Sequence, residues 1–170
     1  MRAYKKLFRG DAAPTLMSLL QEARLQLVEI GGRGSAFSEL VSLARVADYF
    51  VSEPDRVEAE RLAGRLRQDA PWRSVTVMFE AIGARCGTAT LHVTHRPGMS
   101  SLLEPDPSVA SRFCKREHFD VARTVTVPVL TLEEAARRYG FSDAGFLKID
   151  TQGTELDVLT SGASMLLCAG

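Results

Sequence analysis

The stretch that decides the fold is Leu25-Gln26-Leu27-Val28-Glu29-Ile30-Gly31-Gly32-Arg33-Gly34. Its first six residues predict a short buried strand, and the glycines that follow break it. Beyond them, apolar residues recur at helical spacing, at Phe37, Leu40, Val41 and Ala44. The stretch therefore predicts a strand, a glycine turn and a helix, which is the opening unit of a parallel α/β sheet.

The rest of the chain alternates between the same two periods. Further strands are predicted at residues 48–52, 75–79, 124–130 and 146–149, and residues 87–94 predict another strand whose direction, parallel or antiparallel, stays open. Helices are expected at residues 11–23, 55–66, 109–113, 131–139 and 155–159, with Asp11, Asp55 and Thr131 as caps. We therefore predict a doubly wound α/β domain with a mostly parallel sheet. Residues 166–168 are interpreted as the stub of a strand, so the C-terminal strands of such a domain are expected to be missing or the sequence to be a fragment.

Composition narrows the class of protein. The chain has 170 residues, 45% of them hydrophobic, and 21 basic residues balance 21 acidic ones. These values exclude disordered, collagen-like and coiled-coil proteins, and they give no general attraction to nucleic acid or to an anionic membrane. The basic N-terminus lacks the apolar core of a signal peptide, so we expect a cytoplasmic protein.

Cysteine and histidine spacing gives little sign of a disulfide or a metal centre. The three cysteines, Cys86, Cys114 and Cys168, are far apart and form no C-x-x-C pair, so we expect reduced thiols. His92 and His95 are three residues apart in a predicted strand, which places them on opposite faces. We therefore predict no metal site.

Three features are predicted to meet where the parallel strands end. The glycines after residue 30 allow backbone amides and a helix N-terminus to face a ligand. Glu53 follows Gly31 by 22 residues, close to the ~20 expected for an acid that binds both hydroxyls of a ribose. Asp150 ends the strand expected to neighbour the first one, so it faces the same crevice or caps the next helix. Together they predict a nucleoside site.

The nucleoside is not well explained as part of a nicotinamide cofactor. The fingerprint G-x-G-x-x-G requires a third glycine, and counting from Gly32 and Gly34 that position holds Phe37. Glu29, an acid at the end of the first strand, is unusual for a dehydrogenase and familiar in S-adenosylmethionine sites. The residues thus favour S-adenosylmethionine.

Six motifs in order resemble the FkbM family of class I, S-adenosylmethionine-dependent methyltransferases, over residues 26–165. Residues 28–38 resemble V-D-V-G-A-N-x-G-x-F-S, and residues 52–55 resemble F-E-P-D. Residues 81–91 resemble A-L-G followed by G-x-A-x-L, residues 100–102 match S-S-L, and residues 127–132 resemble V-x-V-x-T-L-D. The most specific match is residues 146–156, FLKIDTQGTEL, which resemble L-L-K-I-D-V-E-G-A-E-L.

The resemblance implies a Rossmann-like domain over residues 26–170 that binds S-adenosylmethionine, after a helical lead-in at residues 1–25. It implies an enzyme that methylates a hydroxyl on a small molecule or sugar, and the balanced composition predicts no nucleic-acid or membrane partner. The cofactor residues that it implies are Glu29, Gly31, Gly32, Glu53, Glu80, Ala81 and Asp150. In this assignment the first three shape the methionine side, Glu53 holds the ribose and Glu80 or Ala81 lies beside adenine. Asp150 faces the methyl group and is the candidate base.

Two alternatives stay open at this point. Arg33, Ser35 and Gln152 replace the family's asparagine, glycine and glutamate. These changes are consistent with a methyltransferase-like module that no longer catalyses, and a nicotinamide-dependent oxidoreductase is the other alternative. For Lys148 and Glu155, a structural contact and a substrate contact are both open, and the sequence predicts neither the acceptor nor the oligomeric state.

Overall fold

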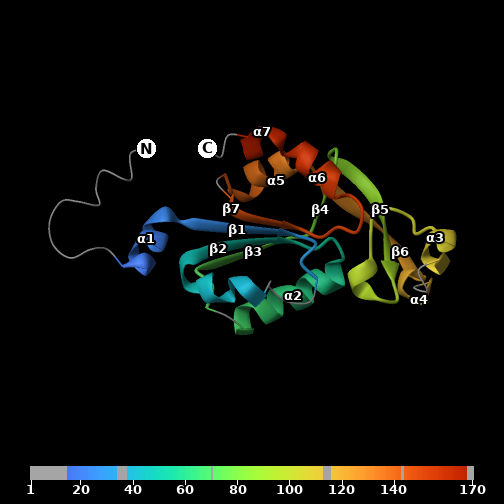
Figure 1. Cartoon of the computed structure of the whole chain (residues 1–170), viewed down its shortest axis with the longest axis horizontal. Coiled ribbons are helices and arrows are strands. Elements are labelled where there is room, and N and C mark those ends of the chain that lie inside the picture. The colour runs from blue at the N-terminus through green and yellow to red at the C-terminus, as the bar shows by residue number, and fades with distance from the viewer. Residues whose placement is uncertain (1–14, 34–37, 70, 113–115, 143, 168–170) are drawn as a thin grey trace.

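The stretch that opened the sequence analysis forms strand β1 (Leu25–Ile30) inside a four-stranded parallel sheet with the order β3-β2-β1-β7. The computed structural model of the protein describes residues 15–33, 38–69, 71–112, 116–142 and 144–167. Strands β2 (Ala47–Ser52) and β7 (Ala144–Ile149) flank β1, and β3 (Ser74–Met78) pairs with β2 (Figure 1). The predicted pairing of the first strand with the strand that precedes Asp150 is confirmed.

Helices cover both faces of this sheet, as the doubly wound prediction requires. Helix α2 (Arg56–Asp69) lies on one face, and α5 (Leu132–Tyr139), α6 (Glu155–Ser161) and α7 (Ala163–Leu167) lie on the other (Figure 1). Because neighbouring side chains of a strand point to opposite faces, Leu27 packs in the core beside α2, whereas Val28 and Ile30 pack in the core that includes Val158 of α6. Burial on both faces explains why apolar residues of β1 point to both sides of the sheet.

A second, three-stranded sheet with the order β4-β6-β5 stands beside the first. Strand β5 (Gly87–Thr94) runs antiparallel to β6 (Val121–Leu130), and the short β4 (Ala81–Ile82) runs parallel to β6. The antiparallel direction that the sequence left open for residues 87–94 is therefore the one observed. The segment between β5 and β6 contains the 3-10 helix η3 (Pro97–Met99) and the short helices α3 (Pro107–Arg112) and α4 (Arg116–Phe119).

The predicted boundaries of α5 are confirmed in atomic detail. The Thr131 hydroxyl oxygen accepts a hydrogen bond from the backbone N–H of Glu134 at 3.1 Å, which satisfies one of the free N–H groups of the first turn. Gly140 ends the helix with φ +79°, a left-handed conformation that favours glycine. Local sequence signals were sufficient here because both contacts are local.

The connection between β1 and β2 is the 3-10 helix η2 (Ser38–Val46) and not the predicted α-helix. It must run back along a six-residue strand, which is about 20 Å long. Nine residues span about 18 Å as a 3-10 helix and about 14 Å as an α-helix. With the same number of residues, a 3-10 helix therefore covers more of this return than an α-helix would. Phe37, which was expected in this helix, lies outside the described residues.

The two ends of the described chain also differ from the sequence-based predictions. Helix α1 (Leu16–Ala23) is capped by Thr15, and the predicted cap Asp11 lies outside the described residues. The interpretation of residues 166–168 as the stub of a strand is wrong for its described part, since Leu166 belongs to helix α7. Its side chain and that of Met165 pack against the core beside α5 and α6, which favours a helix at this place.

Candidate functional site

The glycine turn after β1 is held tightly between its two neighbouring strands. The N–H groups of Gly31 and Gly32 both donate to the carbonyl oxygen of Ser52 at 3.0 Å. Gly31 has φ +86°, and a Cβ at this residue would lie 2.1 Å from the carbonyl oxygen of Asp150. A Cβ at Gly32 would lie 1.9 Å from Cγ2 of Val51. The glycines therefore permit close contact between strands, and the expectation that these two amides face a ligand is wrong because both are already hydrogen-bonded.

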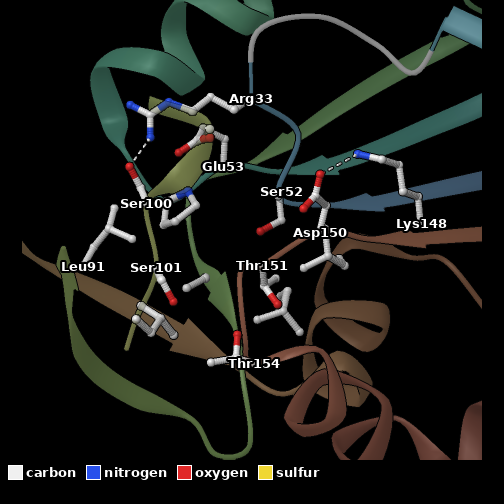
Figure 2. A pocket seen from close by; sticks show the side chains of 17 residues that line it. Arg33, Ser52, Glu53, Leu91, Ser100, Ser101, Lys148, Asp150, Thr151 and Thr154 are labelled. Carbon is white, nitrogen blue, oxygen red and sulfur yellow. Dashed lines mark hydrogen bonds and ion pairs between the residues drawn. The ribbon is translucent and has the colours of Figure 1, made fainter. Parts of the chain in front are cut away.

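The turn opens into a hollow at the carboxyl ends of β1, β2 and β7. The chain passes from β1 to β2 on one side while β7 lies on the other, so this is the point of an open parallel sheet where ligands usually bind. The hollow contains about 730 Å³ of empty space, its open mouth included, and we call it the switch-point hollow (Figure 2). Its lining residues are Ile30, Gly31, Arg33, Ser52, Glu53, Pro54, Ala81, Ile82, Leu91, Gly98, Ser100, Ser101, Leu102, Lys148, Asp150, Thr151 and Thr154.

Four of the seven residues predicted to bind a cofactor line this hollow, namely Gly31, Glu53, Ala81 and Asp150. The other three, Glu29, Gly32 and Glu80, are buried and lie outside the lining. The structure thus brings together a turn, two acids and an apolar residue that are up to 119 positions apart in the sequence.

Glu53 stands at the end of β2 as a buried acid with one oxygen engaged. Only 3% of the residue is exposed, and Oε1 accepts a hydrogen bond from the backbone N–H of Asp55 at 2.8 Å. Burial raises the pKa of Glu53 above its usual value, although the Asp55 N–H and the nearby Arg33 guanidinium act in the opposite direction. A buried acid of this kind gains from a ligand that donates hydrogen bonds to its other oxygen.

Asp150 at the end of β7 belongs to a charged network. The amide of Gln152 donates to Oδ1 at 2.7 Å, and Nζ of Lys148 lies 3.7 Å from Oδ2. Lys148 also donates to Oε1 of Glu29 at 2.8 Å, and the Tyr49 hydroxyl donates to Oε2 of the same glutamate. Glu29 is therefore a buried partner of Lys148, whereas the side chain of Asp150 remains 52% exposed at the hollow.

Glu80 follows β3 but turns away from the hollow. Its carboxylate accepts a hydrogen bond from Arg138 at 2.9 Å and one from the Tyr139 hydroxyl at 2.6 Å, and both donors come from α5. Burial, and secondarily the hydrogen bond and the charge of Glu80, raise the pKa of Tyr139 to about 12. Both carboxylate oxygens are engaged within the protein, so Ala81 is the member of this predicted pair that faces the hollow.

Arg33 is a residue of the hollow that the sequence marked only as a departure from the family motif. Its guanidinium donates to Oγ of Ser100 at 3.1 Å and to Oδ2 of Asp55 at 3.2 Å (Figure 2 draws the Ser100 contact). The same Oδ2 accepts from Arg123 of β6 at 2.7 Å, and the Asp55 side chain is only 2% exposed. Arg33 thus links the glycine turn of one sheet to the second sheet, a contact between distant residues that no local pattern predicts.

The hollow contains two threonines that sequence reasoning also missed. Thr151 and Thr154 follow β7, and their hydroxyl oxygens are buried without a hydrogen-bond partner among the described residues. The sequence pattern indicated a capping or ligand role at this place for Asp150 alone and gave neither threonine a role. No group of three or more His, Cys, Asp or Glu side chains within the described ranges is arranged to hold a metal ion.

A parallel sheet covered by helices on both faces, with a hollow at the switch point between β1 and β7, defines a Rossmann-like α/β domain. The sequence model of the methyltransferase FkbM domain matches residues 32–169, which is most of the chain, and the protein belongs to this methyltransferase family. Searches of curated proteins and of solved structures gave no match. In the part of the chain that the structure describes, no helix has the length and apolar character needed to cross a bilayer.

Proposed function

We propose that this protein is an S-adenosylmethionine-dependent methyltransferase that binds its cofactor in the switch-point hollow and methylates a hydroxyl group of a small molecule or sugar. One observation carries the proposal. Gly31, Glu53 and Asp150 directly follow three adjacent parallel strands and line one hollow at the place in the sheet where ligands usually bind. Membership of a methyltransferase family supports a methyl donor as the ligand.

The residues present fit this cofactor. Gly31 lines the hollow with backbone alone, and Glu53 has one oxygen that the described residues do not engage, so it can accept from both ribose hydroxyls. Pro54 and Ala81 add apolar surface to the lining of the hollow, as a base requires. The half-exposed Asp150 lies where the turn and β7 meet.

The cofactor supplies a methyl group on a positively charged sulfur, so the protein needs to align the acceptor and remove its proton. Gln152 holds Oδ1 of Asp150, and Oδ2 faces Lys148 at the longer distance of 3.7 Å. In this proposal Oδ2 of Asp150 accepts the hydroxyl proton. Lys148 and Glu29 keep the carboxylate in place, which assigns Lys148 a positioning role.

Calorimetric titration of the full chain with S-adenosylmethionine tests the proposal, with Glu53→Gln and the exposed control Glu60→Gln on α2. We expect binding by the wild type and by Glu60→Gln, and a loss of roughly 10- to 100-fold in affinity for Glu53→Gln, because charged hydrogen bonds to the ribose are removed. A folded wild-type chain that does not bind would refute the enzyme assignment and support a non-catalytic module. Unchanged binding by Glu53→Gln would refute the ribose assignment alone.

The transfer step is tested separately with methyl-labelled cofactor and a panel of sugars and small alcohols, and the product is followed by its mass. We expect Asp150→Asn to bind the cofactor and lose most of the transfer, because an amide cannot accept the proton. The cytoplasmic location and the lack of nucleic-acid and membrane partners stay predictions from composition.

A further inference from the structure

The hydroxyl of Thr154 lacks the partner that its position normally provides. Thr154 precedes α6 as its N-cap residue, but its φ of −106° and ψ of 17° are not extended and its side chain makes no capping hydrogen bond. The residue is 5% exposed, and Oγ1 is buried without a hydrogen-bond partner among the described residues. Figure 2 shows Thr154 at the end of the hollow opposite Arg33. A buried hydroxyl that faces a cavity without a partner calls for a ligand group.

The neighbouring Thr151 differs because its backbone N–H donates to a carboxylate, Oε1 of Glu155, at 3.0 Å. Burial acts to raise the pKa of Glu155, but hydrogen bonds from the backbone N–H groups of Gly153 and Thr151 lower it overall. The Glu155 carboxylate thus serves the turn before α6 in place of a capping hydroxyl. This leaves the Thr154 hydroxyl without a capping role.

The position of Thr154 identifies the end of the hollow that it serves. Val158 lies one helical turn further along α6, on the same face, and packs in one core cluster with Ile82 of β4. Ile82 also lines the hollow, together with Ala81 before it and Leu102, which packs against the core of the second sheet. Thr154 is therefore a hydroxyl without a hydrogen-bond partner among the described residues, beside the apolar residues Ala81, Ile82 and Leu102 of the lining.

A nucleobase has apolar faces and a polar edge, so it needs a hydrogen-bonding group at such an end. Glu80, the acid of this segment, is engaged by Arg138 and Tyr139 and lies outside the lining. The Ser101 hydroxyl donates to the carbonyl oxygen of Gln152 at 2.9 Å. Neither side chain is left for the base.

We propose that Oγ1 of Thr154 hydrogen-bonds the polar edge of the nucleobase of the bound cofactor. This inference rests on the proposed function, because it requires a nucleoside in the switch-point hollow. It deepens that function by naming the side chain that recognises the base, a position that the family motif does not mark for this role.

The test compares Thr154→Val, which has the same shape without the hydroxyl, with Thr154→Ser, which restores it, and with Thr160→Val as control. The Thr160 hydroxyl is on the exposed face of the same helix and donates to the carbonyl oxygen of Leu156. Calorimetry measures the affinity of each variant for S-adenosylhomocysteine and for 5′-methylthioadenosine, which keeps the base and ribose but lacks the amino acid. Thermal unfolding of the free proteins is the second readout.

We expect Thr154→Val to bind both ligands roughly 3- to 10-fold more weakly, with Thr154→Ser and Thr160→Val within about twofold of the wild type. The free Thr154→Val protein should melt no lower than the wild type, since it loses no protein hydrogen bond. Equal affinities of Thr154→Val and wild type would overturn the inference and leave the proposed function intact. This result is expected if the hydroxyl faces the methyl acceptor and not the base. A loss for S-adenosylhomocysteine alone would place the hydroxyl at the amino acid and also overturn the inference. A wild type that binds neither ligand overturns the proposed function itself.

Discussion

Alanine at Gly31 should destabilise the protein far more than alanine at Gly140, although both glycines have left-handed backbones. Their φ values are +86° and +79°. For alanine this conformation costs about 1–2 kcal/mol at either position. At Gly140 an added Cβ meets nothing within 4 Å, whereas at Gly31 it would lie 2.1 Å from the carbonyl oxygen of Asp150. Comparison of Gly31→Ala with Gly140→Ala therefore separates the cost of backbone strain from the cost of steric conflict.

The conflict at Gly31 cannot be relieved by a side-chain rotation, because the opposing atom is backbone. Either the turn or β7 must move by about 1 Å, which weakens the hydrogen bond from Asp150 N–H to the carbonyl of Ile30, 2.9 Å long, and those from the turn to Ser52. Each such bond contributes about 1 kcal/mol. We expect Gly31→Ala to lose about 3–5 kcal/mol of unfolding free energy, and Gly140→Ala about 1–2 kcal/mol.

Urea unfolding measures both losses through the fluorescence of Trp72, the one tryptophan of the chain, whose ring stacks on Tyr49 at a centroid distance of 4.5 Å. The midpoints and slopes give the unfolding free energies directly if the transitions are two-state. Equal losses of unfolding free energy for the two variants would show that the turn and β7 are not in the close contact described, and the reasoning about Gly31 would fail.

Two further predictions concern pH. Burial raises the pKa of Glu53 above its ordinary 4.5, so ionising this residue costs more free energy in the folded than in the unfolded state. Glu53→Gln should therefore be more stable than the wild type at neutral pH. Urea titrations should show this difference in stability shrinking as the pH falls through the raised pKa. Hydrogen bonding from Arg73 lowers the pKa of Asp48 below 3.8, and burial acts in the opposite direction. The ion pair of Asp48 with Arg73 therefore stabilises the fold at pH values above 3.8, and this stabilisation is lost as the pH falls through the lowered pKa. Asp48→Asn should therefore cost about 1–2 kcal/mol at neutral pH and distinctly less near about pH 3, and a gap that stays constant with pH would contradict the assigned ion pair.

Local signals in the sequence were sufficient to predict the main sheet. The apolar strand before Gly31, the cap at Thr131 and the strand that ends before Asp150 each depend on a few neighbouring residues, and their arrangement follows from the rules of parallel α/β sheets. Glu53 and Gly31 line one hollow for the same reason, since the carboxyl ends of adjacent parallel strands meet at one edge.

The parts that the sequence did not predict depend on distant partners. Glu80 turns away from the hollow because α5, some 58 positions later, presents Arg138 and Tyr139 to it. Glu29 is buried against Lys148, which is 119 positions away. Periodicity and motif spacing carry no information about such pairs. An acid that faces a ligand and an acid that faces a structural cation therefore look alike in the sequence.

The shared oxygen of Asp55 has a consequence for redesign of this protein. One carboxylate atom receives a guanidinium from the glycine turn and another from β6, so a single buried anion sets the gap between the two sheets. Libraries aimed at bulkier cofactor analogues should therefore keep Asp55 fixed and diversify Leu91 and Leu102, two apolar residues of the lining that take no part in these ion pairs.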